Sequence, residues 1–304
     1  MERSSRLPYG EHRIVYILMK KPIIALLLLS LFLVNCKSTS DNYDDAFILK
    51  YPVILVHGIV AHDRWDTFSF WGRIPAELQR NGVLVFFGNT DAWGSYESNA
   101  ELLKATVDNV LLETNSEKVN IIAHSKGGID SRYFIWKYGY GDKVASLTTI
   151  STPHRGAEIA EVLWEQQIIH TNAARNALHV FGRLYGDNNP NLYKIIYDLS
   201  CSNMERFNEE VILDERVYFH SIYSVMNNSC NEPLFSNSYR FIMRERGAND
   251  GVVSEYSSRW GENITRIERL SHIEIIDIKK RNIAGINVLD IYTGIIRDLA
   301  ERGF

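Results

Sequence analysis

The segment Ala123-His124-Ser125-Lys126-Gly127 is the strongest candidate for a nucleophile in the chain. Its serine has a small residue two positions before it, Ala123, and another two positions after it, Gly127. An apolar run of strand length precedes Ser125 and a helical pattern follows it, so the serine falls at a strand-to-helix turn. Such a turn exposes a serine hydroxyl at the edge of a sheet, where it can act as a nucleophile. The electropositive start of the following helix suits a developing oxyanion. The pattern small-x-Ser-x-Gly is common by chance. The strand before the serine and the helix after it are what predict a nucleophile.

An oxyanion hole needs a second donor from another loop. His57-Gly58-Ile59 follows the first predicted strand and is placed to supply it. We expect the backbone N–H groups of Ile59 and Lys126 to be the two donors. The alternative, that His57 and Gly58 only end a strand, is weaker beside a nucleophile turn.

A serine nucleophile needs a histidine base, and that base needs a carboxylate to orient it. After such a turn the chain order is serine, aspartate, histidine. His272, in the polar turn Leu270-Ser271-His272, is the histidine that fits this order. The others precede the serine, follow it too closely, or sit in an apolar strand pattern typical of a core residue: His12, His57, His62, His124, His154, His170, His179 and His220.

Asp250 is the predicted acid, because Asn249-Asp250-Gly251 is a turn signal upstream of His272. Asp214, Glu245 and Glu255 are rival carboxylates, and for each of them a solvated surface position is the simpler interpretation.

The elements that must position these residues follow an alternating pattern. Helical patterns around Trp71–Leu78, Leu103–Val110 and 127–138 separate short apolar runs, and an amphipathic helix closes the chain over 286–299. Apolar strands alternating with helices predict an open, mostly parallel sheet with helices on both faces. The expected strands are 53–56, 83–87, 118–123, 144–150, 217–225, 239–243 and 264–267.

The N-terminal segment predicts export. Twelve residues from Ile23 to Val34, apolar except for Ser30, cover about 18 Å as a helix, less than the roughly 30 Å of a bilayer core. With Lys20 and Lys21 before it, the run is typical of a signal peptide over residues 1–35, and Met19 is a plausible alternative start. A buried core helix is the alternative.

Leu33-Val34-Asn35-Cys36 resembles a bacterial lipobox, in which the cysteine becomes the lipidated first residue. Asn35 departs from the usual small residue, so cleavage without lipid stays open. We expect Cys36 to begin a lipidated tether over 36–48, followed by one domain over 49–304. The exported protein would be anchored at the cell envelope, with secretion as the alternative.

Composition excludes several classes of protein. The 304 residues carry 33 Lys and Arg against 37 Asp and Glu, so no general positive field exists for nucleic acid. The three cysteines lack the spacing of a zinc site. If Cys36 carries lipid, export favours a disulfide between the remaining pair, Cys201 and Cys230.

Over roughly residues 50 to 275, the chain resembles the secreted bacterial triacylglycerol lipases of the α/β-hydrolase fold. The matching segments are Tyr51 to Gly58, Asn99 to Leu103, Ala123 to Arg132, Ser151 to Gly156 and Asn249 to Ser258, with 22 residues between Asp250 and His272. The resemblance implies the α/β-hydrolase fold and the triad Ser125, Asp250 and His272.

Two departures from this family concern a metal and a disulfide. The resemblance implies a structural calcium ion bound through Glu274 and an amide side chain at position 278, but Ile278 offers no side-chain oxygen. We therefore expect no cofactor. The family's disulfide has its second cysteine at the position of Tyr256, so this bridge does not carry over to the chain. The resemblance leaves a foldase requirement undetermined.

The stretch 157–200 is helical in pattern and rich in apolar residues, and in the resembling lipases it is the lid. Its apolar side chains are Leu163, Trp164, Ile168, Ile169, Leu178, Phe181, Leu184 and Tyr185. An amphipathic lid would meet substrate at a membrane or emulsion surface. An ordinary helical cap, giving an esterase for smaller soluble esters, is the alternative.

The leading interpretation is a triacylglycerol lipase or carboxylesterase that forms an acyl-serine intermediate. An acyltransferase or thioesterase would use the same triad with another acceptor or leaving group. A catalytically silent lipid-binding lipoprotein is a hypothesis of a different class, and the complete set of nucleophile, acid and base argues against it.

Overall fold

A computed structural model describes residues 49–59, 70–184 and 190–304. The predicted signal peptide, the alternative start at Met19, the lipidation site Cys36 and the tether lie outside these ranges. From Ala46 to Phe304 the chain forms one compact unit. In the described ranges, no helix combines the length and apolar character needed to cross a membrane.

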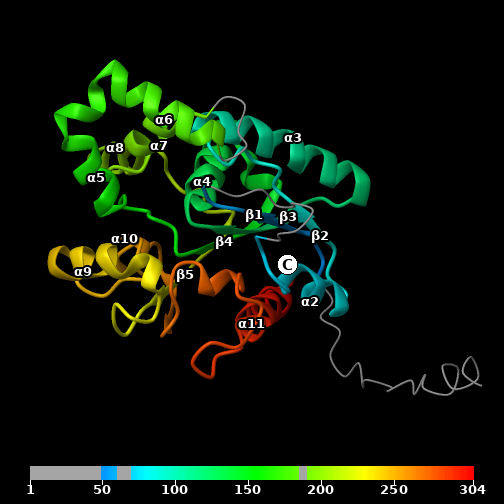
Figure 1. The fold of residues 1–304 in the computed structure, drawn as a ribbon. Helices are drawn as coiled ribbons and strands as arrows, with labels where there is room; N and C mark the ends of the chain where they lie inside the picture. Colours follow the sequence, from blue (N-terminus) through cyan, green and yellow to red (C-terminus); the bar gives the residue numbers. More distant parts are fainter. Residues whose placement is uncertain (1–48, 60–69, 185–189) are drawn as a thin grey trace, which may run out of the picture. The chain divides into compact units, whose positions relative to one another are not determined.

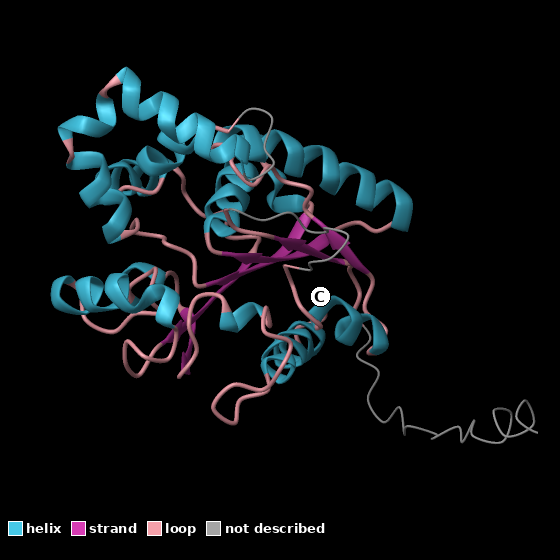
Figure 2. Ribbon diagram, in the orientation of Figure 1, coloured by secondary structure: helices cyan, strands magenta, loops and turns pink. Residues whose placement is uncertain are grey.

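A six-stranded sheet forms the centre of this unit, in the order β2-β1-β3-β4-β5-β6 (Figures 1 and 2). All five strand pairings are parallel. The predicted open parallel sheet is therefore confirmed. The strands are β1 (Val53–Val56), β2 (Val85–Phe87), β3 (Val119–His124), β4 (Val144–Ile150), β5 (Tyr218–Val225) and β6 (Asn263–Glu268).

Helices cover both faces of the sheet because the buried strands are apolar on both sides. Along β1, Val53 and Leu55 pack into the core under α2 and α11, whereas Ile54 and Val56 pack into the core under α3 and α4. Figure 1 shows these two helix pairs on opposite sides of the sheet. Their bounds are α2 (Ile74–Arg80), α3 (Tyr96–Thr114), α4 (Lys126–Tyr138) and α11 (Val288–Glu301).

Between β4 and β5 the chain forms a group of helices with an apolar cluster of its own. Ala160, Ile195, Met204 and Phe207 pack there with Ile129 of α4, which joins these helices to the sheet domain. The helical cap is defined here as α5 to α7, and α8 follows it. The elements are α5 (Glu158–Glu165), the 3₁₀ turn η2 (Gln167–His170), α6 (Asn172–Leu184), α7 (Leu192–Asp198) and α8 (Cys201–Glu210).

The prediction of a strand over 239–243 is wrong, because these residues lie in the helix α9 (Ser236–Glu245). Tyr239 and Ile242, three places apart, share the buried face of the helix. Arg240 is exposed, so the segment has a helical rather than a continuous buried pattern. The remaining short elements are η1 (Tyr140–Asp142), η3 (Pro233–Phe235), α10 (Glu255–Ser258) and η4 (Glu274–Ile276).

The strand order reverses between β1 and β3. From β1 the chain crosses to β2 on one side, and β3 then pairs with β1 on its other side. The carboxyl ends of the strands at such a switch point form the usual ligand crevice of an open α/β sheet. Ile59, just after β1, and Ser125, just after β3, both lie at this edge.

Candidate active site

The backbone of Ser125 adopts an unusual conformation between β3 and α4. Its φ is 54° and its ψ is −129°, a region that a side-chain-bearing residue enters at a cost of about 1–3 kcal/mol. Neighbouring groups hold it there: the Ser125 N–H donates to Ile150 O over 2.8 Å, and Ser125 O accepts from Thr152 Oγ1 over 2.8 Å. The turn projects the serine side chain at the carboxyl edge of the sheet.

Close backbone contacts explain the small residues around the serine. A Cβ atom at Gly127 would lie 2.5 Å from His57 O and 2.7 Å from Val56 O. A Cβ atom at Gly58 would lie 2.8 Å from Ser125 Cβ. The loop after β1 and the start of α4 can therefore approach each other this closely only with glycine at both positions.

Ser125, His272 and Asp250, predicted separately from the sequence, are brought together in one hydrogen-bonded relay. His272 Nε2 lies 3.0 Å from Ser125 Oγ, and His272 Nδ1 lies 2.7 Å from Asp250 Oδ2. All three side chains are buried, with exposed fractions of 6%, 6% and 0% for Ser125, His272 and Asp250. This geometry is that of a nucleophile, a base and an orienting carboxylate.

The loop that carries Asp250 is fixed to β5 and to the histidine. Asn249 O accepts from Met226 N–H over 2.8 Å, which attaches the loop just beyond the end of β5. Asp250 Oδ1 accepts from the N–H groups of Val252 and Val253 over 2.9 and 2.8 Å. One carboxylate oxygen is thus held by the backbone, and the other is left to orient His272.

His124, next to the serine, supports His272 from the side. His124 Nε2 donates to His272 O over 3.0 Å, and the centroids of the two rings are 4.6 Å apart. Complete burial lowers the pKa of His124 well below its ordinary value, and the nearby His272 lowers it further. His124 therefore stays neutral and does not repel a positive charge that forms on His272.

A buried ion pair follows the serine in sequence. Lys126 Nζ lies 2.6 Å from Asp130 Oδ1, and both side chains are 2% exposed. Asn99 Nδ2 donates to the other oxygen of Asp130 over 2.7 Å, which links α4 to α3. Sequence reasoning missed this side-chain role of Lys126, although Lys126 and Asp130 at positions i and i+4 of a predicted helix were the available signal.

The predicted oxyanion donors lie on the two segments that meet at the serine. Lys126 is the first residue of α4, where a helix leaves its N–H without an internal partner. Ile59 follows Gly58, the residue that packs against Ser125.

The rejected histidines and carboxylates have other partners. His154 lies 3.0 Å from Thr149 Oγ1 through its Nε2, and His220 Nε2 lies 2.9 Å from Thr265 Oγ1. Asp214 pairs with Arg216, whose hydrogen bonds lower the pKa of Asp214 to about 2. Glu255 accepts from Tyr223 Oη and pairs with Arg266, and Glu245 is exposed.

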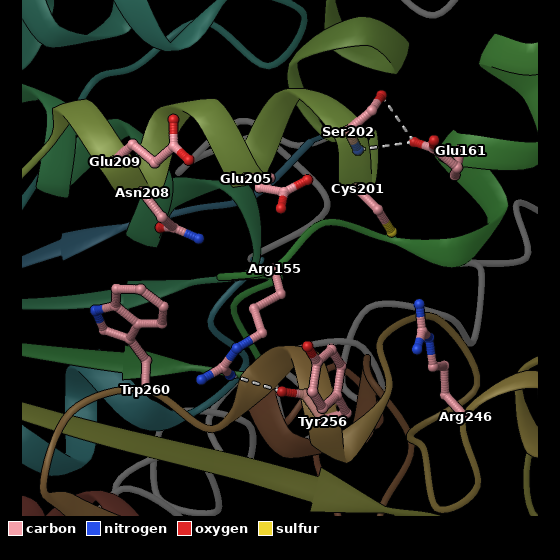
Figure 3. Close-up of a pocket in the computed structure, with 10 residues that line it drawn as sticks. All are labelled: Arg155, Glu161, Cys201, Ser202, Glu205, Asn208, Glu209, Arg246, Tyr256 and Trp260. Atoms are coloured by element: carbon pink, nitrogen blue, oxygen red, sulfur yellow. Dashed lines mark hydrogen bonds between the residues drawn. The ribbon is translucent and has the colours of Figure 1, made fainter.

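The predicted disulfide is wrong, because Cys201 and Cys230 are both free thiols. Cys201 opens α8, and its side chain points into a cavity between α8 and the segment around Tyr256 (Figure 3). Cys230 is exposed in the turn after β5, where its N–H donates to Asn228 Oδ1 over 2.9 Å. The two thiols belong to separately fixed elements, a fact that counting cysteines does not reveal.

The cavity beside Cys201 has a volume of about 600 Å³, and most of the residues that line it are charged or polar. Arg155 rises through its middle, and Figure 3 shows Glu205 and Glu209 above it on α8. Ser125, Asp250 and His272 are not among the residues that line this cavity. It is therefore a different feature from the relay.

Gly127→Ala should disrupt the turn around the serine, because the added methyl group would meet two backbone oxygens within 2.7 Å. We expect the free energy of unfolding to fall by at least a few kcal/mol, or the labelling of Ser125 by a fluorophosphonate probe to be lost. The matched control is Gly294→Ala in α11, where an added Cβ meets nothing within 4 Å. The control should be stabilised by about 0.5–1 kcal/mol, as in any open helical position. Equal behaviour of the two variants would contradict the close packing of this turn.

The variant His154→Gln tests whether His154 is a buried neutral histidine or a catalytic base. Burial lowers the pKa of His154 well below its ordinary value, and Arg132 and Arg155 lower it further. In the unfolded chain this histidine binds a proton below about pH 6.5, whereas in the folded chain it does not. Its neutral state therefore costs nothing above pH 6.5, and stability is lost as the pH falls below that value.

The free energy of unfolding of the unsubstituted protein should accordingly fall with decreasing pH more steeply than that of His154→Gln, by about 1.4 kcal/mol per pH unit. Urea unfolding at a series of pH values between 5 and 8 measures the two slopes. Folded His154→Gln should remain labelled by the fluorophosphonate probe. Loss of labelling with no change of slope would return His154 to the list of candidate bases.

No family model matches the chain. Over 257 residues it is 29% identical to triacylglycerol lipase 2 of Saccharomyces cerevisiae, covering 78% of this chain and 74% of that protein. It is 34% identical to a triacylglycerol lipase of Burkholderia plantarii over 176 residues, 57% of this chain and about half (47%) of the relative.

The fold is similar to that of the solved Staphylococcus hyicus lipase, with a TM-score of 0.65 at 18% identity, covering 83% of this chain and 96% of that one. At this identity the structural similarity concerns the fold alone. The chain is therefore similar in sequence to triacylglycerol lipases, and its fold is that of the α/β-hydrolases.

Proposed function

We propose that the chain hydrolyses carboxylic esters of lipids through an acyl intermediate on Ser125. The observation that carries this proposal is the relay itself, in which a strained serine lies 3.0 Å from a histidine that is 2.7 Å from a buried carboxylate. A protein that only bound lipid would not need this arrangement. The sequence similarity to triacylglycerol lipases supports the same chemistry.

In the first half of the reaction, Ser125 Oγ attacks the ester carbonyl carbon and His272 Nε2 takes the hydroxyl proton. Asp250 stabilises the imidazolium that forms, while neutral His124 adds no opposing charge. The C–O bond to the leaving alcohol then breaks, and His272 returns the proton to that oxygen. In the second half, water replaces the alcohol, and the carboxylic acid leaves as Ser125 recovers its proton.

The negative charge on the carbonyl oxygen requires donors that are already in place. We assign this role to the backbone N–H groups of Lys126 and Ile59. The close packing of Gly58 against Ser125 supports the assignment, because it brings the loop after β1 to the serine. The Lys126 side chain does not serve the oxyanion, since its ammonium pairs with Asp130.

Ser125→Ala and His272→Ala should each lower turnover by on the order of 10⁴-fold or more, and the double variant should lose little further, because the residues act as a unit. Asp250→Ala should cost somewhat less. Initial rates on a p-nitrophenyl ester, with folding checked by circular dichroism, measure these losses. His220→Gln is the matched control, and a large loss there with a near-normal rate for His272→Ala would overturn the assignment.

We further propose that the helical cap meets substrate at a lipid surface. The cap exposes Val162, Leu163 and Ile168 by 39%, 41% and 71%, and Val180 of α6 by 56%. Trp164 is half-buried and packs against His170, Tyr193 and Tyr197, so less of its surface is free to contact lipid. Ile169 is buried, and the side chains of Phe181 and Leu184, together with Tyr185, lie outside the described residues.

Ile168→Asp should lower the rate on emulsified long-chain esters while leaving soluble p-nitrophenyl acetate unaffected, because a charge opposes insertion of the cap into lipid. The matched control is Leu112→Asp on α3, which is 83% exposed outside the cap. Esters from acetate to palmitate, with and without emulsion, separate the two substrate classes. An equal response of both variants would favour an esterase for small soluble esters.

A further inference from the structure

Two carboxylates are buried near His272 and share one cation. Glu274, in η4, is 3% exposed, and Glu232, just before η3, is 7% exposed. Lys279 Nζ lies 2.7 Å from Glu274 Oε1 and 2.8 Å from Glu232 Oε2. Buried carboxylates are costly unless they are paired, so this ammonium compensates both of them.

The calcium ion implied by the family resemblance does not fit these residues. Calcium takes about six to eight oxygen ligands at roughly 2.3–2.6 Å. Ile278 supplies no side-chain oxygen. The carboxylate of Glu274, which would have to bind the ion, is already paired with the ammonium of Lys279 over 2.7 Å. Within the ranges described, no cluster of three or more histidine, cysteine or acidic side chains is suited to a metal.

Glu274 connects this cation to the base. Its second oxygen, Oε2, accepts from Ser271 N–H over 2.9 Å, and Ser271 directly precedes His272. The backbone returns the contact, because Glu274 N–H donates to Ser271 O over 3.1 Å. A shift of the Glu274 carboxylate would therefore move the peptide that carries His272.

Glu232 connects the same cation to the acid loop. It immediately precedes η3, where a Cβ atom at Gly251 would lie 2.6 Å from Phe235 Cβ. Gly251 follows Asp250, and Asp250 O accepts from His272 N–H over 2.9 Å. The segments on which Asp250 and His272 lie are thus joined both directly and through Lys279.

We propose that Lys279 is a positioning residue, a built-in cation that replaces a structural metal ion and holds the loop of His272 in register with the acid loop through Glu274 and Glu232. The inference rests on the proposed function, since it takes His272 as the base. Burial lowers the pKa of Lys279, but its contacts with Glu232 and Glu274 outweigh burial and raise it above its ordinary value. The side chain therefore stays charged throughout the working pH range.

The test compares Lys279→Met and Lys279→Arg in the full chain, with Lys280→Met as the matched control because Lys280 is the exposed neighbour. The concentration of folded sites is set by fluorophosphonate titration of Ser125, so that kcat refers to folded enzyme only. Lys279→Met should lower kcat by about 10-fold or more with KM little changed, the usual size of an outer-shell effect. Lys279→Arg should retain most of kcat, and Lys280→Met should match the unsubstituted enzyme.

Glu274→Gln should reproduce the loss in kcat, and adding Lys279→Met to it should cost little more, because the two side chains act together. The melting temperature and kcat of the unsubstituted enzyme should not change with a chelator or with added calcium. If Lys279→Met does not fold, Lys279→Gln, which keeps a hydrogen-bond donor without the charge, takes its place in the same comparison.

The proposal is overturned if titrated Lys279→Met has the kcat of the unsubstituted enzyme, since Lys279 would then serve stability alone. It is also overturned if a chelator lowers the melting temperature and calcium restores it. Failure of the proposed function looks different. In that case Ser125→Ala would keep its turnover, whatever the Lys279 variants did.

Discussion

The site depends on the close approach of two backbone segments, the loop after β1 and the turn from β3 into α4. Gly127 lies under the carbonyl groups of Val56 and His57, and Gly58 lies against Ser125. This contact fixes the unfavourable φ of the serine, because neither segment can relax without separating the two strands that lie side by side at the centre of the sheet. The strain is offset by the packing of the whole parallel sheet, in which β1 and β3 are completely buried.

The remaining residues of the relay come from loops, and loops need their own anchors. Asp250 is held by backbone N–H groups of its own turn, and its loop is attached just beyond β5. His272 is held by its N–H and C=O groups, which bond to Asp250 and His124. Further along, Asp277 fixes the end of η4 to Arg73 through a bidentate pair of 2.7 and 2.8 Å. Several contacts, before and after His272 in the sequence, therefore restrain this residue, and none of them does so alone.

Two ion pairs and one neutral histidine lie next to residues of the relay. Lys126 pairs with Asp130, and Lys279 pairs with Glu232 and Glu274. His124, which contacts His272, is kept neutral by burial. Within the low dielectric of the site, an uncompensated charge near His272 would alter its basicity, so this pattern preserves the single proton transfer that the chemistry needs.

The sequence by itself determined the parallel sheet, the serine turn and the order of serine, acid and base. Each of these rests on a local pattern: a buried strand is a continuous apolar run, and a strand-to-helix turn needs small neighbours. Tyr239 to Met243 shows where local patterns fail, because five apolar and basic residues fit a strand or a helix equally well. Only packing of Tyr239 and Ile242 on one face decided for the helix.

Tertiary structure alone decided which distant charges and thiols meet. Cys201 and Cys230 are both free thiols although elimination paired them, and Lys279 reaches Glu232 from 47 positions away along the chain. Ile278 indicated only that a calcium ligand was missing, not that the next residue carries a cation to the same carboxylate. Contacts of this kind depend on how loops are folded onto the sheet, and a loop position is set by many weak interactions that leave no periodic mark in the sequence.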